Sequence, residues 1–231
     1  MSEHPFLVPK QQRSQHTQKK LLKALNHSLK SKFFEHISIK ELADYAEVSV
    51  GTFYRRFKNK ESLLPMLYQD FGIALDNWVT ELEAQHYENI DAVVNTLCHK
   101  TYVFLLSQQG VFRTLHLNSR LHSELLGTDK HINRRVIYQR LAQLISQTDT
   151  KVSEMAAGTA VFLIVSSLLD KVLYHDLTPA IACDLSAQQY AQELPKIILA
   201  YLGRVDLWWL NLQQYVWFLG KTEPMKCGYS T

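Results

Sequence analysis

The feature that most constrains this chain is a pair of short helical patterns with only two residues between them. The first opens at Ser38, and Glu41 three residues later completes a capping-box pattern, which satisfies free backbone donors at a helix start. Its apolar residues recur at helical spacing on one face. They are Ile39, Leu42, Ala43 and Ala46. The dipeptide Glu47-Val48 follows, so the sequence predicts a helix that ends in a tight turn.

The second helical pattern begins at Ser49, a residue type whose side-chain oxygen caps helices. Its predicted inward residues are Val50, Phe53 and Phe57. The remaining positions are polar, aromatic or cationic: Thr52, Tyr54, Arg55 and Arg56. A helix, a short turn and a second helix that presents such side chains are typical of the helix-turn-helix, which binds in the DNA major groove.

This segment resembles the DNA-binding domain of the TetR family of bacterial transcriptional regulators. The matching pieces are Ser-Ile-Lys-Glu-Leu-Ala at 38–43, Val-Ser-Val-Gly-Thr-Phe-Tyr at 48–54, Phe57, and Lys-Asn-Lys-Glu-Ser-Leu-Leu at 58–64. The resemblance covers about residues 17–64, and the rest of the chain agrees only in helix rhythm and length. One departure is Glu47, where the family usually has Gly. A non-Gly residue with positive φ costs on the order of 1 kcal/mol, so either the turn is altered or the fold absorbs the cost.

We expect nine residues of this segment to contact DNA. They are Ser38, Ser49, Val50, Gly51, Thr52, Tyr54, Arg55, Arg56 and Lys60. The resemblance implies phosphate contacts for Thr52, Tyr54 and Lys60. Ser38, at a helix N-terminus, could hold a phosphate in the same way, and such contacts position a protein without reading sequence.

Contacts with base edges are assigned to three other residues of the second helix. Val50, Arg55 and Arg56 are the candidates, because Arg binds guanine bidentately and a Val methyl can meet a thymine methyl. Lys60 follows Asn59, a predicted helix cap, and the backbone donors and dipole of a helix start favour a phosphate.

Composition and charge agree with this interpretation. The chain has 231 residues, of which 46% are hydrophobic and 20% charged, as in soluble globular proteins. The net charge of +3 is uneven: residues 1–68 hold twelve Lys/Arg against six Asp/Glu, and the remainder is acidic. A basic N-terminal third attached to an acidic body favours a small nucleic-acid-binding domain.

Several classes of protein are disfavoured. Three distant cysteines (Cys98, Cys183 and Cys227) form no metal-binding spacing and no disulfide framework, which favours a reducing cytoplasm. We find no signal peptide and no run of about 18 apolar residues, so we expect no transmembrane helix. No phosphate loop, zinc-protease or nucleophile-elbow motif is present, and we expect no catalytic residue, no metal and no cofactor.

The expected fold is all-α, with an N-terminal three-helix helix-turn-helix domain and a C-terminal helical ligand-binding and dimerisation domain. We divide the chain into a flexible arm (1–13), the DNA-binding domain (14–64), the effector and dimerisation domain (65–203) and an aromatic extension (204–231). Periodicity predicts helices at 14–34, 38–57 (the pair), 59–84 with a bend at Pro65, 89–108, 111–126, 129–147, 153–175 and 186–203. Gly110 and the Gly127-Thr128-Asp129 run punctuate the central helices, and Arg134, Arg135 and Arg140 are expected to face outward.

A homodimer on a palindromic operator is expected on two grounds. A helix-turn-helix needs two copies to bind two half-sites. The resemblance implies that the last two long helices, 153–175 and 186–203, pair with those of a second subunit. The uncharged segment Leu207–Leu219 must also be covered, and we favour packing on the body or across the dimer over a membrane surface.

The resemblance implies a repressor that a small molecule releases. Pockets are mostly apolar with a few orienting polar groups, and eight body residues are candidates for its lining. They are His99, Tyr102, Phe104, Phe112, Arg113, His116, Phe162 and Ser166. Two alternatives remain open: a TetR-like regulator controlled by a protein partner through residues 204–231, and an unrelated helical enzyme.

Overall fold

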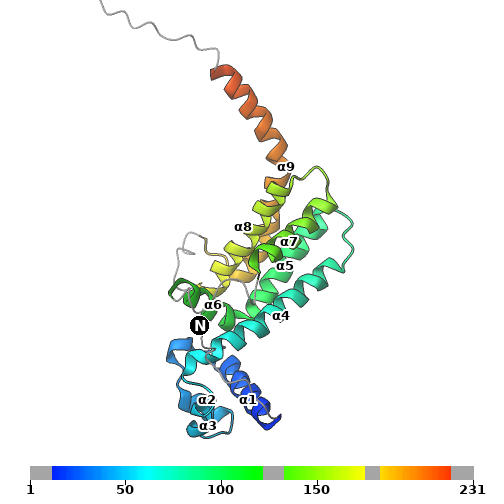
Figure 1. Cartoon of the computed structure of the whole chain (residues 1–231). Helices are drawn as coiled ribbons and strands as arrows, with labels where there is room; N and C mark the ends of the chain where they lie inside the picture. Colours follow the sequence, from blue (N-terminus) through cyan, green and yellow to red (C-terminus); the bar gives the residue numbers. More distant parts are fainter. Residues whose placement is uncertain (1–11, 122–132, 175–182, 220–231) are drawn as a thin grey trace, which may run out of the picture.

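The structure is a computed structural model that describes residues 12–121, 133–174 and 183–219, with the side chains of the last helix described as far as Gly203. Within these ranges every regular element is helical, as the sequence predicts. The N-terminal domain and the longer helices of the body form one elongated molecule, with α2 and α3 at one end (Figure 1). Three predicted features lie outside the described residues: the helix break at Gly127-Thr128-Asp129, the arm up to residue 11 and the residues after Leu219.

The N-terminal domain is built on three helices: α1 (Gln12–Ser28), α2 (Ile39–Tyr45) and α3 (Val50–Tyr54). Two 3₁₀ turns, η1 (Phe34–His36) and η2 (Lys60–Leu63), flank the pair. The apolar stripe of α1 buries Leu21 and Leu25 almost completely, and Leu29, the first residue after the helix, is buried with them. Phe53 and Phe57, which lie with these leucines in one buried cluster, have ring centroids 5.3 Å apart. The helix-turn-helix pair is therefore fixed to α1 by burial of apolar area.

Helix caps form where the sequence predicts them, with one difference at α2. Ser38 Oγ accepts a hydrogen bond from the Glu41 backbone N–H at 3.1 Å, but the Glu41 carboxylate accepts from Lys32 Nζ at 2.9 Å. At the start of α9 both halves of the predicted capping box form, because Ser186 and Gln189 each accept from the other's backbone N–H.

Three predicted boundaries are wrong for local reasons. α1 ends at Ser28 rather than at 34, and η1 follows. Asn59 caps η2 rather than a long helix, so α4 begins at Leu64 and Pro65 lies in its first turn. Proline is tolerated there because the first helical N–H groups have no partner within the helix, so the predicted bend has no cause. Gly110 does not separate two helices either: it lies inside α6, and the break falls at Gln108.

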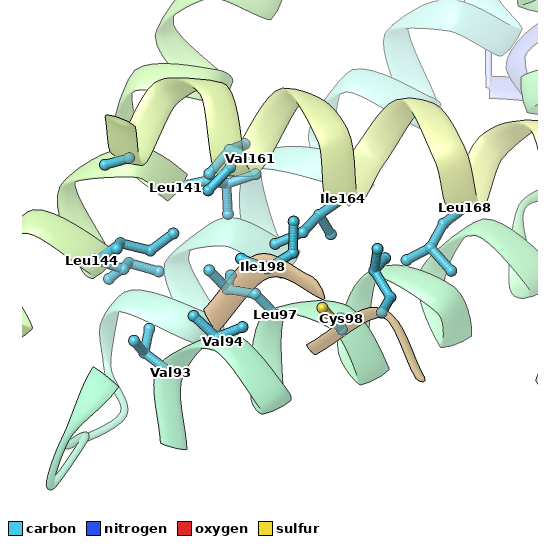
Figure 2. Close-up of a cluster of buried hydrophobic side chains, with 14 of the residues drawn as sticks. Val93, Val94, Leu97, Cys98, Leu141, Leu144, Val161, Ile164, Leu168 and Ile198 are labelled. Atoms are coloured by element: carbon cyan, nitrogen blue, oxygen red, sulfur yellow. The ribbon is translucent and has the colours of Figure 1, made fainter. Parts of the chain in front are cut away.

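The body consists of α4 (Leu64–Glu83), α5 (Ile90–Ser107), α6 (Gln109–Leu121), α7 (Arg134–Thr148), α8 (Glu154–Leu173) and α9 (Ala187–Leu219). α8 packs against α5, α7 and α9, and α5 also packs against α9. Figure 2 shows the centre of this core, where Val94 and Leu97 of α5 meet Leu141 of α7, Ile164 of α8 and Ile198 of α9. Cys98 is buried there, and burial raises the pKa of its thiol to about 12, so it stays a thiol at neutral pH.

The two buried clusters meet along α4 and α6. One spans α1 to α4 together with Val111 and Leu115 of α6, and the other fills the body. Trp78, Phe112 and Ile137 pack against both clusters. Because packed side chains transmit displacement, this junction mechanically connects the body to the N-terminal domain.

The sequence analysis underestimated how long and apolar α8 is. α8 is long and apolar enough to cross a membrane by length and composition, with a mean hydropathy of 1.7, although we expected no such run. Half of that stretch is buried inside the body, where α8 contacts α5, α6, α7 and α9. A core helix of a globular protein passes the same test, so its packing accounts for its composition.

α9 is longer than predicted. It continues through Gly203, the expected end, to Leu219, because a single Gly inside a helix costs only about 1 kcal/mol relative to Ala. Beyond Gly203 its backbone extends away from the helical body (Figure 1). The side chains of this extension lie outside the described residues, so its packing on the body or across the dimer stays a prediction.

Arg140 corrects a second expectation. Instead of facing outward it crosses from α7 to α4, where its guanidinium donates to Glu83 at 2.8 and 2.6 Å, to Thr80 Oγ1 at 3.0 Å and to Asp76. The hydrogen bond from Arg140 holds the pKa of the Glu83 carboxyl below its ordinary value. This bidentate pair fastens α7 to α4.

Candidate nucleic-acid interface and interior cavity

The outer face of α3 presents the polar set that the sequence predicts. Ser49 caps the helix, because its Oγ accepts from the Thr52 N–H at 3.1 Å, and Thr52 Oγ1 in turn accepts from Arg55 Nη2 at 2.9 Å. Tyr54 is 56% exposed and packs edge-on against the buried Phe53 ring. Hydroxyl, phenol and guanidinium groups thus lie together on one exposed surface, which we call the α3 surface (Ser49, Val50, Gly51, Thr52, Tyr54 and Arg55).

Gly51 leaves this surface open. It has no positive φ, and a Cβ placed on it would meet only Ser49 Oγ, at 3.8 Å. The chain itself therefore does not require glycine here, although Gly weakens a helix relative to Ala by about 1 kcal/mol. A glycine at an exposed position also lets another molecule approach the backbone, so the predicted DNA contact of Gly51 is sterically possible.

Two of the predicted base-reading residues are placed differently from expectation. Val50 is 38% exposed, so it is not an inward residue of α3 and is available to a ligand. Arg56 is half-buried and its Nε is enclosed, whereas Arg55 is exposed. Arg55 is therefore the better placed of the two cations, and Ser38 is exposed at the start of α2.

The turn between α2 and α3 keeps the backbone that the family resemblance implies. Glu47 has φ of 53°, the single positive φ at a non-Gly position among the described residues. Its carboxylate accepts from Lys20 Nζ at 3.2 Å, but it is 83% exposed, so this ion pair contributes little. The fold thus absorbs the strain of a left-handed residue instead of altering the turn.

Lys60 is held inside the domain. Its Nζ donates to the carbonyl oxygens of Phe34, Glu35 and Ile37 at 2.6, 3.1 and 2.9 Å, and lies 4.5 Å from the centroid of the Phe34 ring. These three acceptors match the three donors of an ammonium group. Burial lowers the Lys60 pKa, against the opposing effect of Glu61 and Glu35. A phosphate contact by Lys60 stays a prediction, and it requires the ammonium to leave these carbonyls.

A second cation, Arg113 in the body, binds carbonyl groups in the same segment as Lys60. Arg113 of α6 donates from Nη2 to the carbonyls of Leu29 and Lys32 at 3.2 and 2.7 Å, and its guanidinium lies 4.0 Å from the Phe33 ring centroid. We call residues 29–37 the connecting turn. Lys60 and Arg113 between them bind five of its carbonyl groups, so the turn is fixed from both sides.

Gly110 explains how α6 comes so near. A Cβ at this position would lie 2.2 Å from the Leu29 carbonyl oxygen, a distance that side chains do not tolerate. Glycine is therefore required for α6 to lie against the end of α1.

A cavity of about 130 Å³ lies between α4, α5, α6, α7 and α8, at the junction of the two buried clusters. Its lining is mostly apolar. Four aromatic residues contribute: Phe71, Trp78, Phe104 and Phe112. Three polar residues contribute: Thr101, His116 and Tyr138. His116 Nδ1 shares a hydrogen bond with the hydroxyl of Tyr174, which fixes the imidazole at the wall.

Three of the eight predicted pocket residues line this cavity, namely Phe104, Phe112 and His116. The other five lie elsewhere. His99 is exposed, Tyr102 packs on the body core, and Phe162 is 58% exposed. Ser166 Oγ bonds to its own helix, and Arg113 binds the connecting turn.

Sequence reasoning missed Trp78, which lines the cavity and stacks on Phe104 with centroids 4.8 Å apart. Its place in the apolar pattern of α4 gave no sign of this role, because a core position and a cavity wall have the same periodicity. Among the described residues, no group of three His, Cys, Asp or Glu side chains could hold a metal ion.

Comparison with known protein families agrees with this arrangement. Residues 21–66 match the family model of bacterial regulatory proteins of the tetR family. No curated protein matches the sequence.

Solved structures share the fold at low identity. A TetR family transcriptional regulator from Pseudomonas syringae is similar, with a TM-score of 0.55 and 18% identity over 85% of this chain and 97% of that one. GusR of Salmonella enterica has a TM-score of 0.53 and 14% identity, over 81% and 95% of the chains. A putative TetR-family regulator from Mesorhizobium loti has a TM-score of 0.52 and 17% identity, over 84% and 98%.

Proposed function

We propose that this chain, which carries a TetR-family DNA-binding domain on a TetR-like fold, is a homodimeric transcriptional repressor that a small molecule releases from a palindromic operator. The observation that carries the proposal is the α3 surface, where polar groups and an open glycine backbone lie exposed on the second helix of a helix-turn-helix. The protein belongs in the cytoplasm, where its operator is.

The α3 surface supplies both kinds of DNA contact. The Thr52 hydroxyl and the Tyr54 phenol suit phosphate oxygens, and the Arg55 guanidinium suits the O6 and N7 atoms of guanine. The Arg55 hydrogen bond to Thr52 Oγ1 keeps both groups on the same side of α3. Val50 offers a methyl group beside them to a thymine.

Dimerisation through α8 and α9 is supported by exposed apolar side chains. Met155 is 72% exposed, Phe162 58%, Leu163 37% and Ile197 56%. Large apolar groups gathered on two neighbouring helices indicate a protein interface. Gly158 of α8 has nothing within 4 Å of a Cβ position, which leaves room for a partner helix.

Release by a ligand follows from the place of the cavity. Phe112 and His116 of α6 line it, and Arg113, between them, binds the connecting turn. A ligand that prefers one position of α6 would therefore shift the connecting turn and the helix-turn-helix behind it. The two recognition helices of the dimer would then no longer match successive major grooves.

The test is fluorescence anisotropy with duplex DNA from the flanks of the protein's own gene. Arg55→Ala should lose most of the preference for operator over random DNA, at about 1–3 kcal/mol for a bidentate base contact. Lys100→Ala, which removes an exposed cation from α5, is the matched control and should change neither affinity. Equal binding of operator and random DNA by the wild type would contradict the proposal.

The dimer is tested separately. Phe162→Glu places a charge in the proposed interface and should convert the dimer to a monomer in analytical ultracentrifugation. An unchanged sedimentation coefficient would place the interface elsewhere.

A second candidate is a regulator controlled by a protein partner, because α9 continues beyond the body as an extension of uncharged sequence from Leu207 to Leu219. Removing residues 204–231 separates the alternatives. Loss of dimerisation or solubility would indicate that the extension packs across the dimer. An intact dimer that still binds DNA would leave the extension available to another protein.

A further inference from the structure

We propose that the cavity takes a neutral molecule with a single aromatic ring, and that the Thr101 hydroxyl binds an oxygen on the short substituent of that ring. This inference rests on the proposed effector site and adds the chemistry of the molecule that fits it. Size, aromatic walls, charge and one buried hydroxyl each narrow the choice.

Size limits the ligand to one ring with a short substituent. The cavity measures about 130 Å³. For comparison, an apolar cavity on the order of 150 Å³ binds benzene. Fused rings and long acyl chains would have to push the walls apart, which a close-packed interior resists.

The aromatic walls favour a ring over an aliphatic chain of equal size. Trp78 and Phe104 stack with an angle of 20° between their planes. Phe71 and Phe112 meet edge to face, with centroids 4.7 Å apart. A flat ring can add to such a set in offset-stacked or edge-on geometry, which is worth more than its buried area alone.

The charge of the lining favours a neutral ligand. The described residues around the cavity include no Asp, Glu, Lys or Arg. A buried charge without a counter-charge is strongly disfavoured. An ammonium group has no carboxylate to pair with here, and a carboxylate would require the His116 imidazole, which shares a hydrogen bond with the Tyr174 hydroxyl, to take up a proton.

Thr101 lies in the wall that α5 contributes. It lines the cavity together with Phe104 and Leu105, which follow it by three and four residues along the helix. This spacing places the three side chains on one face of α5. Thr101 as a whole is 3% exposed, so its hydroxyl is a polar group inside a mostly apolar wall.

The Thr101 hydroxyl is open to a ligand. Four helical threonines of the body donate to the carbonyl four residues earlier: Thr80, Thr114, Thr148 and Thr159. Thr101 makes no such bond, and its side chain makes no other with the residues that the structure describes. Unlike the Nε1 of Trp78, its oxygen is not closed off on every side. Because Thr101 is buried in the cavity wall, the open side of the hydroxyl faces the cavity.

A hydroxyl at this place selects for a polar atom on the ligand. It offers one donor and two acceptor lone pairs, so it can bind a ligand hydroxyl or carbonyl. A ligand oxygen that loses its water on entry is destabilising unless it finds such a partner. Thr101 therefore makes an oxygen-bearing substituent acceptable in a cavity that is otherwise apolar.

Three probes of equal shape test these points in ligand-observed NMR titrations of the full chain without DNA at pH 7. Benzyl alcohol, ethylbenzene and benzylammonium differ only in the last atom of the substituent, which is oxygen, carbon or a charged nitrogen. The two neutral probes should bind. Benzylammonium should not bind at the same concentrations, because no carboxylate lines the cavity.

Three variants locate the contact. Thr101→Val keeps the shape of the side chain and removes the hydroxyl, so benzyl alcohol should bind on the order of tenfold more weakly while ethylbenzene is unaffected. Thr96→Val is the matched control: Thr96 is half-buried on the same helix but outside the cavity lining, and neither probe should respond. Val165→Phe fills the cavity and should abolish the binding of both neutral probes. Thermal melts followed by circular dichroism establish that each variant is folded.

The inference is overturned if benzylammonium binds wild-type protein as tightly as benzyl alcohol, or if neither neutral probe binds at millimolar concentration. It is also overturned if Thr101→Val changes the affinities of both neutral probes by the same factor. None of these results touches operator binding, which the anisotropy experiment measures independently. Conversely, the expected probe pattern in a protein that ignores operator DNA would support the cavity chemistry and contradict the repressor.

Discussion

The α3 surface and the connecting turn lie in the same small domain, and both depend on cations and glycines, yet they use them in opposite ways. On the α3 surface Arg55 is exposed and Gly51 faces open space. At the connecting turn Arg113 and Lys60 bind carbonyls, and Gly110 touches backbone. The same residue types are thus exposed to solvent in one region and in contact with the protein's own backbone in the other.

The difference teaches that a basic residue near a helix-turn-helix is not by itself a DNA contact. Carbonyl oxygens near the end of α1 and in η1 attract cations as phosphate oxygens do. Lys60 satisfies the sequence pattern of a phosphate ligand and at the same time satisfies three carbonyls of its own chain. Four predictions test this contrast.

The largest effect is expected from the pair of glycines. Gly110→Ala should lower the free energy of unfolding by about 3 kcal/mol, because the new methyl group meets a backbone carbonyl that cannot move away easily. Gly51→Ala should leave stability unchanged or raise it by up to about 1 kcal/mol through helix propensity, while weakening DNA binding. Urea denaturation and anisotropy measure the two quantities. Equal stability losses for both variants would remove the distinction between the regions.

Lys60→Ala should lower the free energy of unfolding by about 2 kcal/mol, since it removes charge-assisted hydrogen bonds to three carbonyls. The exposed neighbour Lys58 is the control, and Lys58→Ala should stay within about 0.5 kcal/mol. The phosphate prediction adds a second readout: binding to all DNA should weaken and the salt slope should flatten by about one unit. A stability loss with an unchanged salt slope would make Lys60 purely structural.

Arg113→Met keeps the apolar stem over Phe33 but removes the two carbonyl contacts, so we expect a loss of about 1.5 kcal/mol in urea denaturation. If the connecting turn transmits the ligand signal, this variant should also bind operator with less response to an occupied cavity. A variant that unfolds like wild type would show that α6 is held to the connecting turn by packing alone.

The smallest expected effect is a gain in the free energy of unfolding. Glu47→Gly should stabilise the protein by about 1 kcal/mol, because glycine adopts φ of 53° without the clash that Glu suffers, and the exposed pair with Lys20 contributes little. Operator affinity should not fall. A loss of stability in thermal melts would mean that the ion pair or the helix end outweighs the strain.

Much of the local structure could be predicted from sequence because its causes are local. Ser38, Ser49 and Asn59 cap the elements that follow them, and the strain at Glu47 follows from a missing glycine. The helical class follows from periodicity. Errors arose where the local sequence is compatible with two structures. Pro65 could kink a helix or lie in its first turn, and the structure has the second. Gly110 and Gly203 could end a helix or lie inside one, and both lie inside one.

The candidate site, too, has a part that follows from local sequence and a part that does not. The polar part of the α3 surface was predictable from helical spacing, whereas Val50 was assigned to the inner face and is exposed. The cavity was not predictable, since Phe104, Phe112 and His116 were found among eight candidates while Trp78 was passed over. Periodicity separates inside from outside, but it cannot separate a filled core from a hollow one.

By itself the sequence determined the helices, their caps and the chemistry that α3 presents, because backbone hydrogen bonding and side-chain periodicity act over a few residues. Only the tertiary structure decided which cations bind carbonyls, which glycine allows α6 to reach α1, and where four aromatic rings leave room for a ligand. Those outcomes depend on distances between elements far apart in the chain, and such distances are set by the packing of the whole molecule.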